Sequence, residues 1–195
     1  MGRIVAIEHI SLDGVIQAPA RADEDRRGGF ALGGWAASNN DPAMQQFIGE
    51  RMGDAWSLLV GRVTYEDLAS VWPKMPRPNP IAESLDRVEK FVVSNTLSEP
   101  FPWKNSTLLK GDGAAAVASL KREHEKTLVV FGSAALLQSL MPRGLIDEYV
   151  LQIHPIVLGK GLRLFSPDGT FSKLELVGSE KTKTGVLLAV YRPMP

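Results

Sequence analysis

Three short segments of the chain combine residue types that suit phosphate binding. They are Gly61-Arg62-Val63-Thr64, Ser94-Asn95-Thr96 and Gly132-Ser133-Ala134. A glycine lets the backbone approach a ligand closely, and free N–H and O–H groups at the start of a helix bind phosphate oxygens. Arg62 adds a cation suited to bidentate phosphate contact. Together the segments favour a phosphate-rich nucleotide ligand, although any strand-to-helix turn also requires small residues.

Each of these segments follows an apolar run with the character of a strand. The runs are 57–60, 91–93 and 127–131, and helical patterns follow the first and the third segment. In an open parallel sheet, ligands bind beyond the carboxyl ends of the strands. The ligand site is therefore expected at these turns.

The rest of the chain alternates strand and helix signals. A strand is predicted over 4–10, and Asp41-Pro42 has the residue types that open a helix. The last part holds three extended runs without intervening helices, 149–157, 174–177 and 186–191. This order predicts one α/β domain over 1–195, with a mostly parallel central sheet, helices on both faces and antiparallel strands at the C-terminal end.

Composition excludes several classes of function. Lys+Arg and Asp+Glu both number 22, so the formal net charge is zero and neither nucleic acid nor an anionic membrane is an expected partner. The absence of cysteine excludes disulfides and cysteine-ligated metals, and the three histidines are far apart, so no metal site is expected. The longest nearly apolar run, 128–137, is too short to span a bilayer, and the N-terminus lacks a signal-peptide pattern. A cytoplasmic protein is expected.

Residues 17–40 show neither a helical nor a strand period. A segment of this length inside a domain is usually functional or disordered. It carries two isolated aromatic residues, Phe30 and Trp35, which would fit a mobile lid over a flat ligand about as well as a contact between subunits. We assign both residues to the expected substrate pocket, with closure of the lid excluding water.

Several ordered motifs resemble known reductases. The segment Leu59-Val60-Gly61-Arg62-Val63-Thr64-Tyr65-Glu66 resembles the G-R-x-T-[YFW]-E segment of dihydrofolate reductases. A longer series is similar to the reductase domain of the riboflavin biosynthesis protein RibD: Ser11-Leu12-Asp13-Gly14, Gly132-Ser133-Ala134-Ala135-Leu136, Gly144-Leu145-Ile146-Asp147-Glu148, His154-Pro155-Ile156-Val157-Leu158-Gly159-Lys160-Gly161 and Leu164-Phe165. The resemblance covers essentially the whole chain, and its specificity lies in the combination of motifs.

This resemblance implies a dihydrofolate-reductase-like fold, NADPH as the hydride donor and a homodimer. It places the segment from Gly61 to Thr64 at the cofactor's phosphates, with Arg62 and Ser94 near the 2′-phosphate. The segment from Gly132 to Ala135 would wrap the pyrophosphate. The full set of implied cofactor residues is Ser11, Val15, Ile16, Gly61, Arg62, Thr64, Ser94, Asn95, Gly132, Ser133, Ala134 and Ala135.

Two acidic residues are candidates for catalysis. The resemblance implies a substrate-binding carboxylate near the start of the first long helix, and Asp41 is the nearest match, although capping of the helix explains it equally well. Asp13 is the second candidate, with a turn as its alternative role. His154 stands before Pro155, where its ring either ends a strand or contacts substrate, and it joins the expected substrate pocket.

Some positions depart from the RibD reductase pattern. Ile7 stands where those reductases carry a lysine, Phe131 where they carry an acidic residue, and Tyr65-Glu66-Asp67 where they carry an Asp-rich segment. These positions serve the sugar-phosphate substrate, so the departures concern the substrate and leave the cofactor side intact.

The sequence thus leads to an NADPH-dependent reductase that transfers hydride to a pteridine- or pyrimidine-type heterocycle. One alternative is the 5-amino-6-(5-phosphoribosylamino)uracil reductase of riboflavin biosynthesis. The other is a non-catalytic, dimeric NADPH-binding protein that keeps the fold without an efficient active site.

Overall fold

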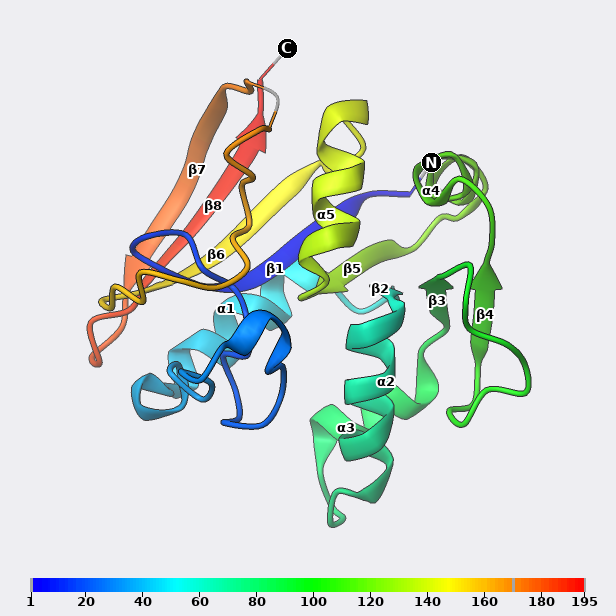
Figure 1. Ribbon diagram of the computed structural model, residues 1–195, viewed down its shortest axis with the longest axis horizontal. Coiled ribbons are helices and arrows are strands. Elements are labelled where there is room, and N and C mark those ends of the chain that lie inside the picture. Colours follow the sequence, from blue (N-terminus) through cyan, green and yellow to red (C-terminus); the bar gives the residue numbers. More distant parts are fainter. Residues whose placement is uncertain (1, 170, 195) are drawn as a thin grey trace.

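The computed structural model describes residues 2–169 and 171–194 (Figure 1). In this part of the chain, eight strands form one sheet: β1 (Ile4–Ser11), β2 (Trp56–Gly61), β3 (Lys90–Val93), β4 (Ser106–Leu109), β5 (Thr127–Phe131), β6 (Glu148–His154), β7 (Leu174–Lys181) and β8 (Leu187–Pro193). The α-helices are α1 (Pro42–Met52), α2 (Arg62–Val71), α3 (Pro80–Arg87), α4 (Gly113–Glu123) and α5 (Ala134–Leu140).

The strand order in the sheet is β4-β3-β2-β5-β1-β6-β8-β7. Strands β1 to β6 pair in parallel, whereas β8 is antiparallel to both β6 and β7. The predicted α/β fold is confirmed, with one refinement at the C-terminal end. Strand β6 belongs to the parallel part because α5 provides the crossover that brings the chain back in the same direction.

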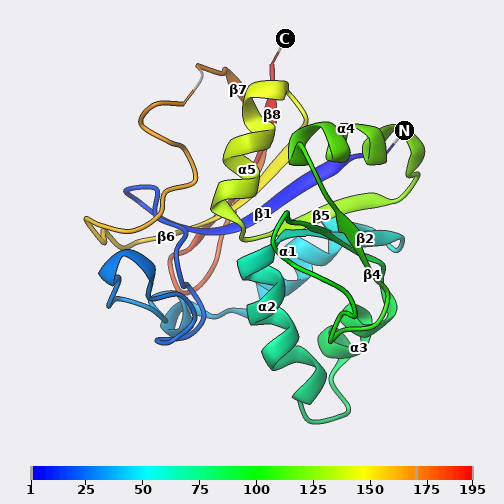
Figure 2. The same ribbon diagram turned by 45° about the vertical axis from the view of Figure 1, so that its right-hand side comes forward.

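Helices cover both faces of the sheet, as Figure 2 shows. The reason is visible along β1, where every residue from Ile4 to Ile7 is buried and neighbours point to opposite sides. Ile4 and Ala6 pack in the core beneath α4 and α5, while Val5 and Ile7 pack in the core beneath α1, α2 and α3. The sheet therefore holds its two layers of helices through separate hydrophobic cores.

The predicted helix starts have the expected caps. The Asp41 carboxylate accepts the N–H of Ala43 at 2.9 Å, and Pro42 occupies the first position of α1. Asn79 caps α3 in the same way ahead of Pro80. Helix α5 ends at Leu140, and a 3₁₀ turn continues to Gly144, whose positive φ of 59° stops the helical path.

Segment 17–40 is packed against the rest of the protein, so the expectation of a mobile lid is corrected. Phe30 and Trp35 are only 4% and 8% exposed and pack with Val15, Ala18 and other apolar residues in a small core of their own. The indole N–H of Trp35 donates to the carbonyl of Gln17 at 2.7 Å. The aromatic rings hold this segment against the body of the protein because burying them removes a large apolar area from water.

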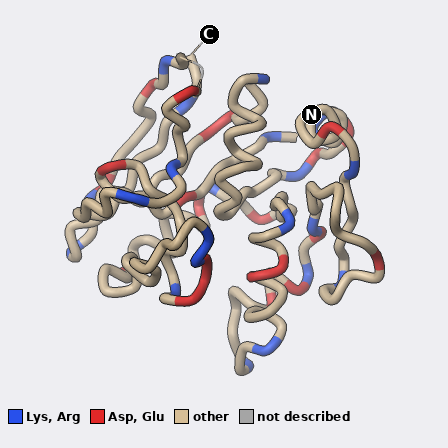
Figure 3. Tube along the Cα trace, in the orientation of Figure 1, with Lys and Arg blue, Asp and Glu red and all other residues tan. Residues whose placement is uncertain are grey.

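Charged residues of both signs are interspersed along the trace, as Figure 3 shows. Most of the ion pairs lie at the surface, including those of Arg62 with Glu66 and of Arg143 with Asp112. Within residues 2–169 and 171–194, no helix has the length and apolar character needed to cross a membrane.

The anchoring of segment 17–40 can be tested at Gly161. A Cβ atom there would lie 2.6 Å from Val15 and 2.9 Å from Phe30, whereas a Cβ at Gly28 would meet nothing within 4 Å. Both glycines have positive φ, but the 124° of Gly161 is harder for alanine to adopt than the 64° of Gly28, so backbone strain and the packing clash both disfavour Gly161→Ala. We expect Gly161→Ala to lower the free energy of unfolding by about 1–3 kcal/mol more than Gly28→Ala in urea titrations. Equal losses would contradict this packing.

Candidate functional site

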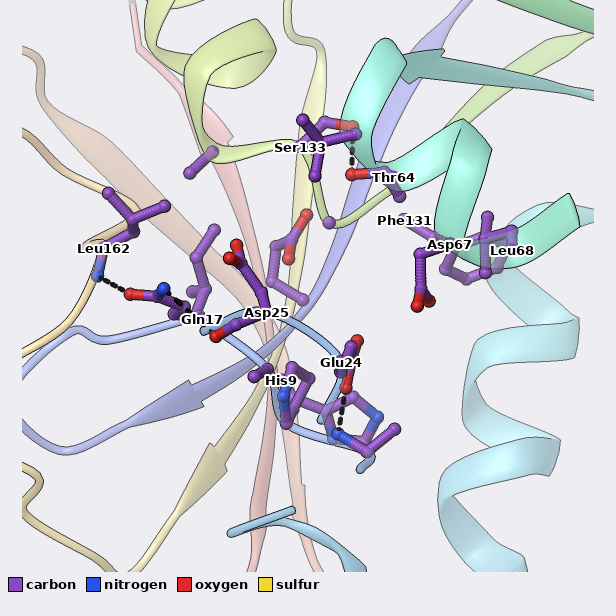
Figure 4. A pocket seen from close by; sticks show the side chains of 18 of the residues that line it. His9, Gln17, Glu24, Asp25, Thr64, Asp67, Leu68, Phe131, Ser133 and Leu162 are labelled. Atoms are coloured by element: carbon purple, nitrogen blue, oxygen red, sulfur yellow. Dashed lines mark hydrogen bonds between the residues drawn. The ribbon is translucent and has the colours of Figure 1, made fainter. Parts of the chain in front are cut away.

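Two of the three expected turns are joined by a chain of hydrogen bonds. Strands β2 and β5 are parallel neighbours, so the turns at Gly61 and Gly132 lie at the same edge of the sheet. The N–H of Gly61 donates to Ser133 Oγ at 2.9 Å, and that hydroxyl donates to Thr64 Oγ1 at 2.8 Å (Figure 4). Ser133 adopts a left-handed conformation, with φ of 69°, that directs its side chain toward this contact rather than onto α5.

The third turn lies beyond β3, the next strand along. The Ser94 hydroxyl accepts the N–H groups of Thr96 and Leu97, which closes the turn on itself. The Asn95 amide exchanges two hydrogen bonds with the backbone of Gly111, at 3.0 and 2.7 Å. These side chains therefore shape the turn and connect it to the end of β4.

All three turns line one groove of about 630 Å³. Three guanidinium groups also line it: Arg27, paired with Asp25, Arg62, paired with Glu66 at 2.8 Å, and Arg143, paired with Asp112 at 2.7 Å. Helix α2 opens into the groove, and no side chain caps its first N–H groups. Partly exposed guanidinium groups and unsatisfied helix N–H groups give this groove the chemistry of a phosphate-binding site.

The groove adjoins an inner pocket of about 230 Å³. Both cavities are lined in part by the same residues, among them Val63, Thr64, Ser133 and Ala134. The pocket lies where β5 stops and β1 continues: Ile7 and Phe131 are the last paired residues of these strands. In Figure 4, Ser133 and Thr64 line its upper part and Gln17, Asp25 and His9 its lower part. The connections after β1 and β5 go to opposite faces of the sheet, which is the usual place for a ligand in α/β folds.

Glu8 lines this inner pocket from β1. The residue is 3% exposed, and its Oε1 has no hydrogen-bond partner among the described residues. Burial raises the pKa of the Glu8 carboxyl well above its usual range, opposed in part by the N–H of Gly132. Glu8 is therefore held as a neutral acid under conditions in which an exposed glutamate is ionised.

Gln152 lines the same pocket from β6. It is 2% exposed, and its Oε1 also has no hydrogen-bond partner in the described part of the chain. Buried polar atoms are almost always hydrogen-bonded in proteins. Two such atoms on one pocket are suited to a ligand that carries matching polar groups.

His154, which is buried, and His9, which is half-buried, form a pair beside the pocket. His9 Nδ1 lies 2.9 Å from His154 Nε2, so one of these nitrogens donates to the other, and Asn39 Nδ2 lies 3.5 Å from His154 Nδ1. In the tautomer in which His154 Nε2 donates, the hydrogen of His9 is on Nε2, on a side chain that lines the pocket. Burial lowers the pKa of both histidines to about 4, so the pair is neutral at pH 7.

The other carboxylates of the inner pocket are already engaged. Glu24 accepts the N–H groups of Ala20 and Arg21 at 2.7 and 3.1 Å. Asp25 forms two hydrogen bonds with the guanidinium group of Arg27, and Asp67 is paired with Arg21. These contacts fix segment 17–40 over the pocket through its polar residues.

The structure brings most of the expected cofactor residues together. Ten of them line the groove or the inner pocket: Ile16, Gly61, Arg62, Thr64, Ser94, Asn95, Gly132, Ser133, Ala134 and Ala135. Ser11 and Val15 do not line either cavity, which corrects their expected place. The Ser11 hydroxyl donates to Asp13 at 2.7 Å and accepts the N–H of Val15 at 2.9 Å, and both residues are buried in this turn.

The two acidic candidates also lie outside the described cavities. Asp13 accepts the N–H groups of Leu158 and Gly159, and these bonds with that from Ser11 lower its pKa to about 2. Such a carboxylate holds no proton to donate at neutral pH. Asp41 uses one oxygen for the cap of α1 and the other for the N–H of Lys183 at 3.1 Å. The geometry gives both residues a structural role.

The expected substrate-pocket residues are corrected in the same way. Trp35 and His154 line none of the described cavities. Their rings pack edge-on against each other instead, with the ring centroids 5.3 Å apart. Phe30 lines only a small side pocket of about 270 Å³, together with Lys160. His9 contacts His154 and also lines the inner pocket.

Sequence reasoning missed Glu8, His9, Gln152 and Arg143. The first three lie within strand patterns, where a polar residue gives no sign of whether it faces solvent or a pocket. The one available signal was the pair Glu8-His9 inside an otherwise apolar strand. Arg143 follows α5 and reaches the groove only because the helix crosses back over the sheet.

The histidine pair predicts loss of stability in acid. The folded-state pKa values of about 4 lie below the ordinary value of 6.5, so the unfolded chain binds more protons between these pH values. Stability is full above pH 6.5 and falls as the pH drops toward 4, by at most ~1.4 kcal/mol per pH unit for each histidine. Urea unfolding at a series of pH values should show this slope in the wild type and a shallower one in His154→Gln. Identical slopes would refute the assignment.

The chain matches relatives of known sequence over most of its length. It is 28% identical over 161 residues to the uncharacterised protein YyaP of Bacillus subtilis, covering 80% of this chain and 82% of YyaP. It is 26% identical over 136 residues to YwjB of the same organism, covering 70% and 73%.

Solved structures share its fold. A protein of Shewanella sp. PV-4 named for riboflavin biosynthesis superposes with a TM-score of 0.71 at 24% identity, covering 99% of both chains. A pyrimidine reductase-like protein of Corynebacterium diphtheriae gives 0.67 at 12% identity, with 100% of this chain and 92% of that one covered. Dihydrofolate reductase of Enterococcus faecalis, in complex with NADP(H), gives 0.62 at 14% identity over 100% and 98%. The fold is therefore dihydrofolate-reductase-like.

The model of the RibD C-terminal domain matches residues 4–188. This range includes the three turns, the inner pocket, strands β1 to β7 and the first two residues of β8. Family and fold together indicate an oxidoreductase of the RibD and dihydrofolate reductase type. The chain belongs to the RibD C-terminal domain family.

Proposed function

We propose that the protein is an NADPH-dependent reductase that transfers hydride to a pteridine- or pyrimidine-type heterocycle. One observation carries the proposal: the groove with its three guanidinium groups shares lining residues with an adjoining pocket that has unpartnered polar atoms. A dinucleotide needs phosphate-binding chemistry at one end and space for a reactive ring at the other. The groove and the pocket offer both in the required order.

The residues present fit NADPH. Bound NADPH supplies a hydride from C4 of its nicotinamide ring. Arg62 and Arg143 would bind phosphate groups, exchanging the carboxylates of Glu66 and Asp112 for the ligand. The turn at Gly132 would let the backbone approach the pyrophosphate, since Gly132 has positive φ and no Cβ to obstruct it.

The inner pocket would orient the heterocycle. Gln152 Oε1 can accept a hydrogen bond from a ring N–H or an amino group, and His9 Nε2 can donate one to a carbonyl or a ring nitrogen. Hydride transfer depends on orientation and exclusion of water, and segment 17–40 covers the pocket with fixed polar contacts.

Reduction of the ribosylaminopyrimidine phosphate of riboflavin biosynthesis is the second candidate. The name of the Shewanella protein favours it. Ile7 and Phe131, an apolar pair in register beside the inner pocket, favour the broader proposal because they replace the lysine and the acidic residue expected for that substrate. Turnover of the phosphate substrate would distinguish the two.

Cofactor binding can be tested at Arg62. Tryptophan fluorescence titration should give NADPH binding that weakens at least tenfold in Arg62→Ala, about 1.4 kcal/mol. NADH binding should change less if Arg62 contacts the 2′-phosphate. Arg122→Ala is the matched control, because Arg122 is an exposed arginine on α4 outside the groove. A folded protein that does not bind NADPH would end the reductase proposal.

We also propose a homodimer that forms at β7. This edge strand pairs only with β8 in the described chain, and Leu176 and Val177 are 52% and 41% exposed on it. An exposed apolar edge strand is prone to pair with another chain. Sedimentation should show a dimer for the wild type and a monomer for Leu176→Lys. A monomeric wild type at micromolar concentration would refute this assembly.

A further inference from the structure

We infer that Glu8 is the proton donor of the reduction: its carboxylic acid, buried on the inner pocket, protonates the ring atom beside the carbon that accepts hydride. The inference rests on the proposed function and goes beyond it, because neither the expected cofactor site nor the acidic candidates of the sequence include this residue. It arises from the one carboxyl group in the pocket that has a fully buried oxygen without a hydrogen-bond partner in the described part of the chain.

The reaction requires such a donor. When a C=N bond accepts hydride at carbon, its π electrons move to nitrogen, and a proton must arrive there. The Glu8 O–H bond breaks and a new N–H bond forms, which leaves a Glu8 carboxylate, the reduced ring and the oxidised nicotinamide. A proton from solvent returns Glu8 to its acid form after the product leaves.

Geometry favours Glu8 among the acids near the pocket. Asp25 and Asp67 are paired with Arg27 and Arg21, so both are stabilised as carboxylates. Burial raises the pKa of Glu24 as well, but its Oε2 accepts two backbone N–H groups, which stabilise the carboxylate and fix it to segment 17–40. Glu8 has no side-chain partner, and its free oxygen is buried in the pocket wall.

His9 does not compete for this role at neutral pH. Its pKa is lowered to about 4 by burial and by His154, so it holds no extra proton to transfer. It can still donate a hydrogen bond to the ring through Nε2. The pocket therefore offers one group that orients the ring and another, Glu8, that carries a transferable proton.

The position of Glu8 connects it with both reactants. It lies one residue beyond the last pair of β1 with β5, beside the Gly132 turn that belongs to the expected cofactor site. Charged and titratable groups that face the pocket are His9 from β1, Glu24, Asp25 and Arg27 from segment 17–40, and Asp67 from α2. The aspartates are ion-paired, His9 is neutral, and two backbone N–H groups oppose the rise in the pKa of Glu24, whereas the pKa of Glu8 is raised well above its usual range, so Glu8 should set the alkaline limit of turnover.

The protonation state can be tested without any substrate. Infrared spectra of the wild-type protein at pH 7 in D2O should contain the carbonyl band of a buried, protonated carboxylic acid, and Glu8→Gln should lack it. Glu148→Gln is the matched control, because Glu148 is equally buried at the start of β6 and lies outside the pocket. If the wild type lacks the band, or Glu8→Gln retains it, Glu8 is ionised and the inference is overturned.

Turnover tests the role itself. NADPH oxidation is followed with a panel of pterins, dihydropterins and aminopyrimidines, for wild type, Glu8→Gln, Glu8→Asp and the Glu148→Gln control. Glu8→Gln should lower kcat by 10²–10⁴-fold, leave NADPH binding within about twofold and abolish the alkaline limb of the pH profile. Glu8→Asp should restore part of kcat, since it keeps an acid at the site.

The outcomes separate the two proposals. Turnover by Glu8→Gln at the wild-type rate overturns the donor and leaves the reductase intact. NADPH binding without turnover of any panel member by the wild type overturns the donor and favours a non-catalytic NADPH-binding protein. Absence of NADPH binding overturns the reductase together with its donor.

Discussion

The inner pocket exists because β1 is longer than β5. Their pairing stops at Ile7 and Phe131, whereas β1 and β6 stay paired as far as Ser11 and His154. One edge of β1 is therefore free of a neighbouring strand just where the Gly132 turn leaves the sheet. The inner pocket and the place of Glu8 beside the Gly132 turn follow from this difference in strand length.

Buried polar atoms at that edge lower the stability of the fold when no ligand forms hydrogen bonds with them. An unpaired buried donor or acceptor lowers stability by roughly 1–3 kcal/mol, and Glu8 and Gln152 each have such an atom. The fold retains both on one small cavity, while the neighbouring carboxylates are fully paired. Of the four buried side-chain atoms without a partner in the described part of the chain, these two share one cavity, while the other two belong to Arg51 and Glu148 outside it.

Segment 17–40 lacks regular secondary structure over most of its length, yet it is packed against the body of the protein and lines the inner pocket. Its aromatic residues anchor it, because Phe30 and Trp35 are buried beside Val15. Its polar residues then face the inner pocket through Gln17, Glu24 and Asp25. Order in this segment comes from packing and ion pairs rather than from regular hydrogen bonding, which explains why it has no periodic sequence pattern.

The sequence by itself determined the elements and the turn chemistry. Apolar runs set β2, β3 and β5, and Asp41-Pro42 and Asn79-Pro80 set two helix starts, because capping and periodicity are local properties. The glycine turns likewise predicted the residues that line the groove, because small residues at strand-to-helix turns are a local pattern. Only the tertiary structure decided which polar residues face a cavity: it placed Asp13 and Asp41 in turns and caps, and Glu8, His9 and Gln152 on the pocket. Burial and unpaired hydrogen bonds depend on strands that are distant in sequence, so no local pattern could report them.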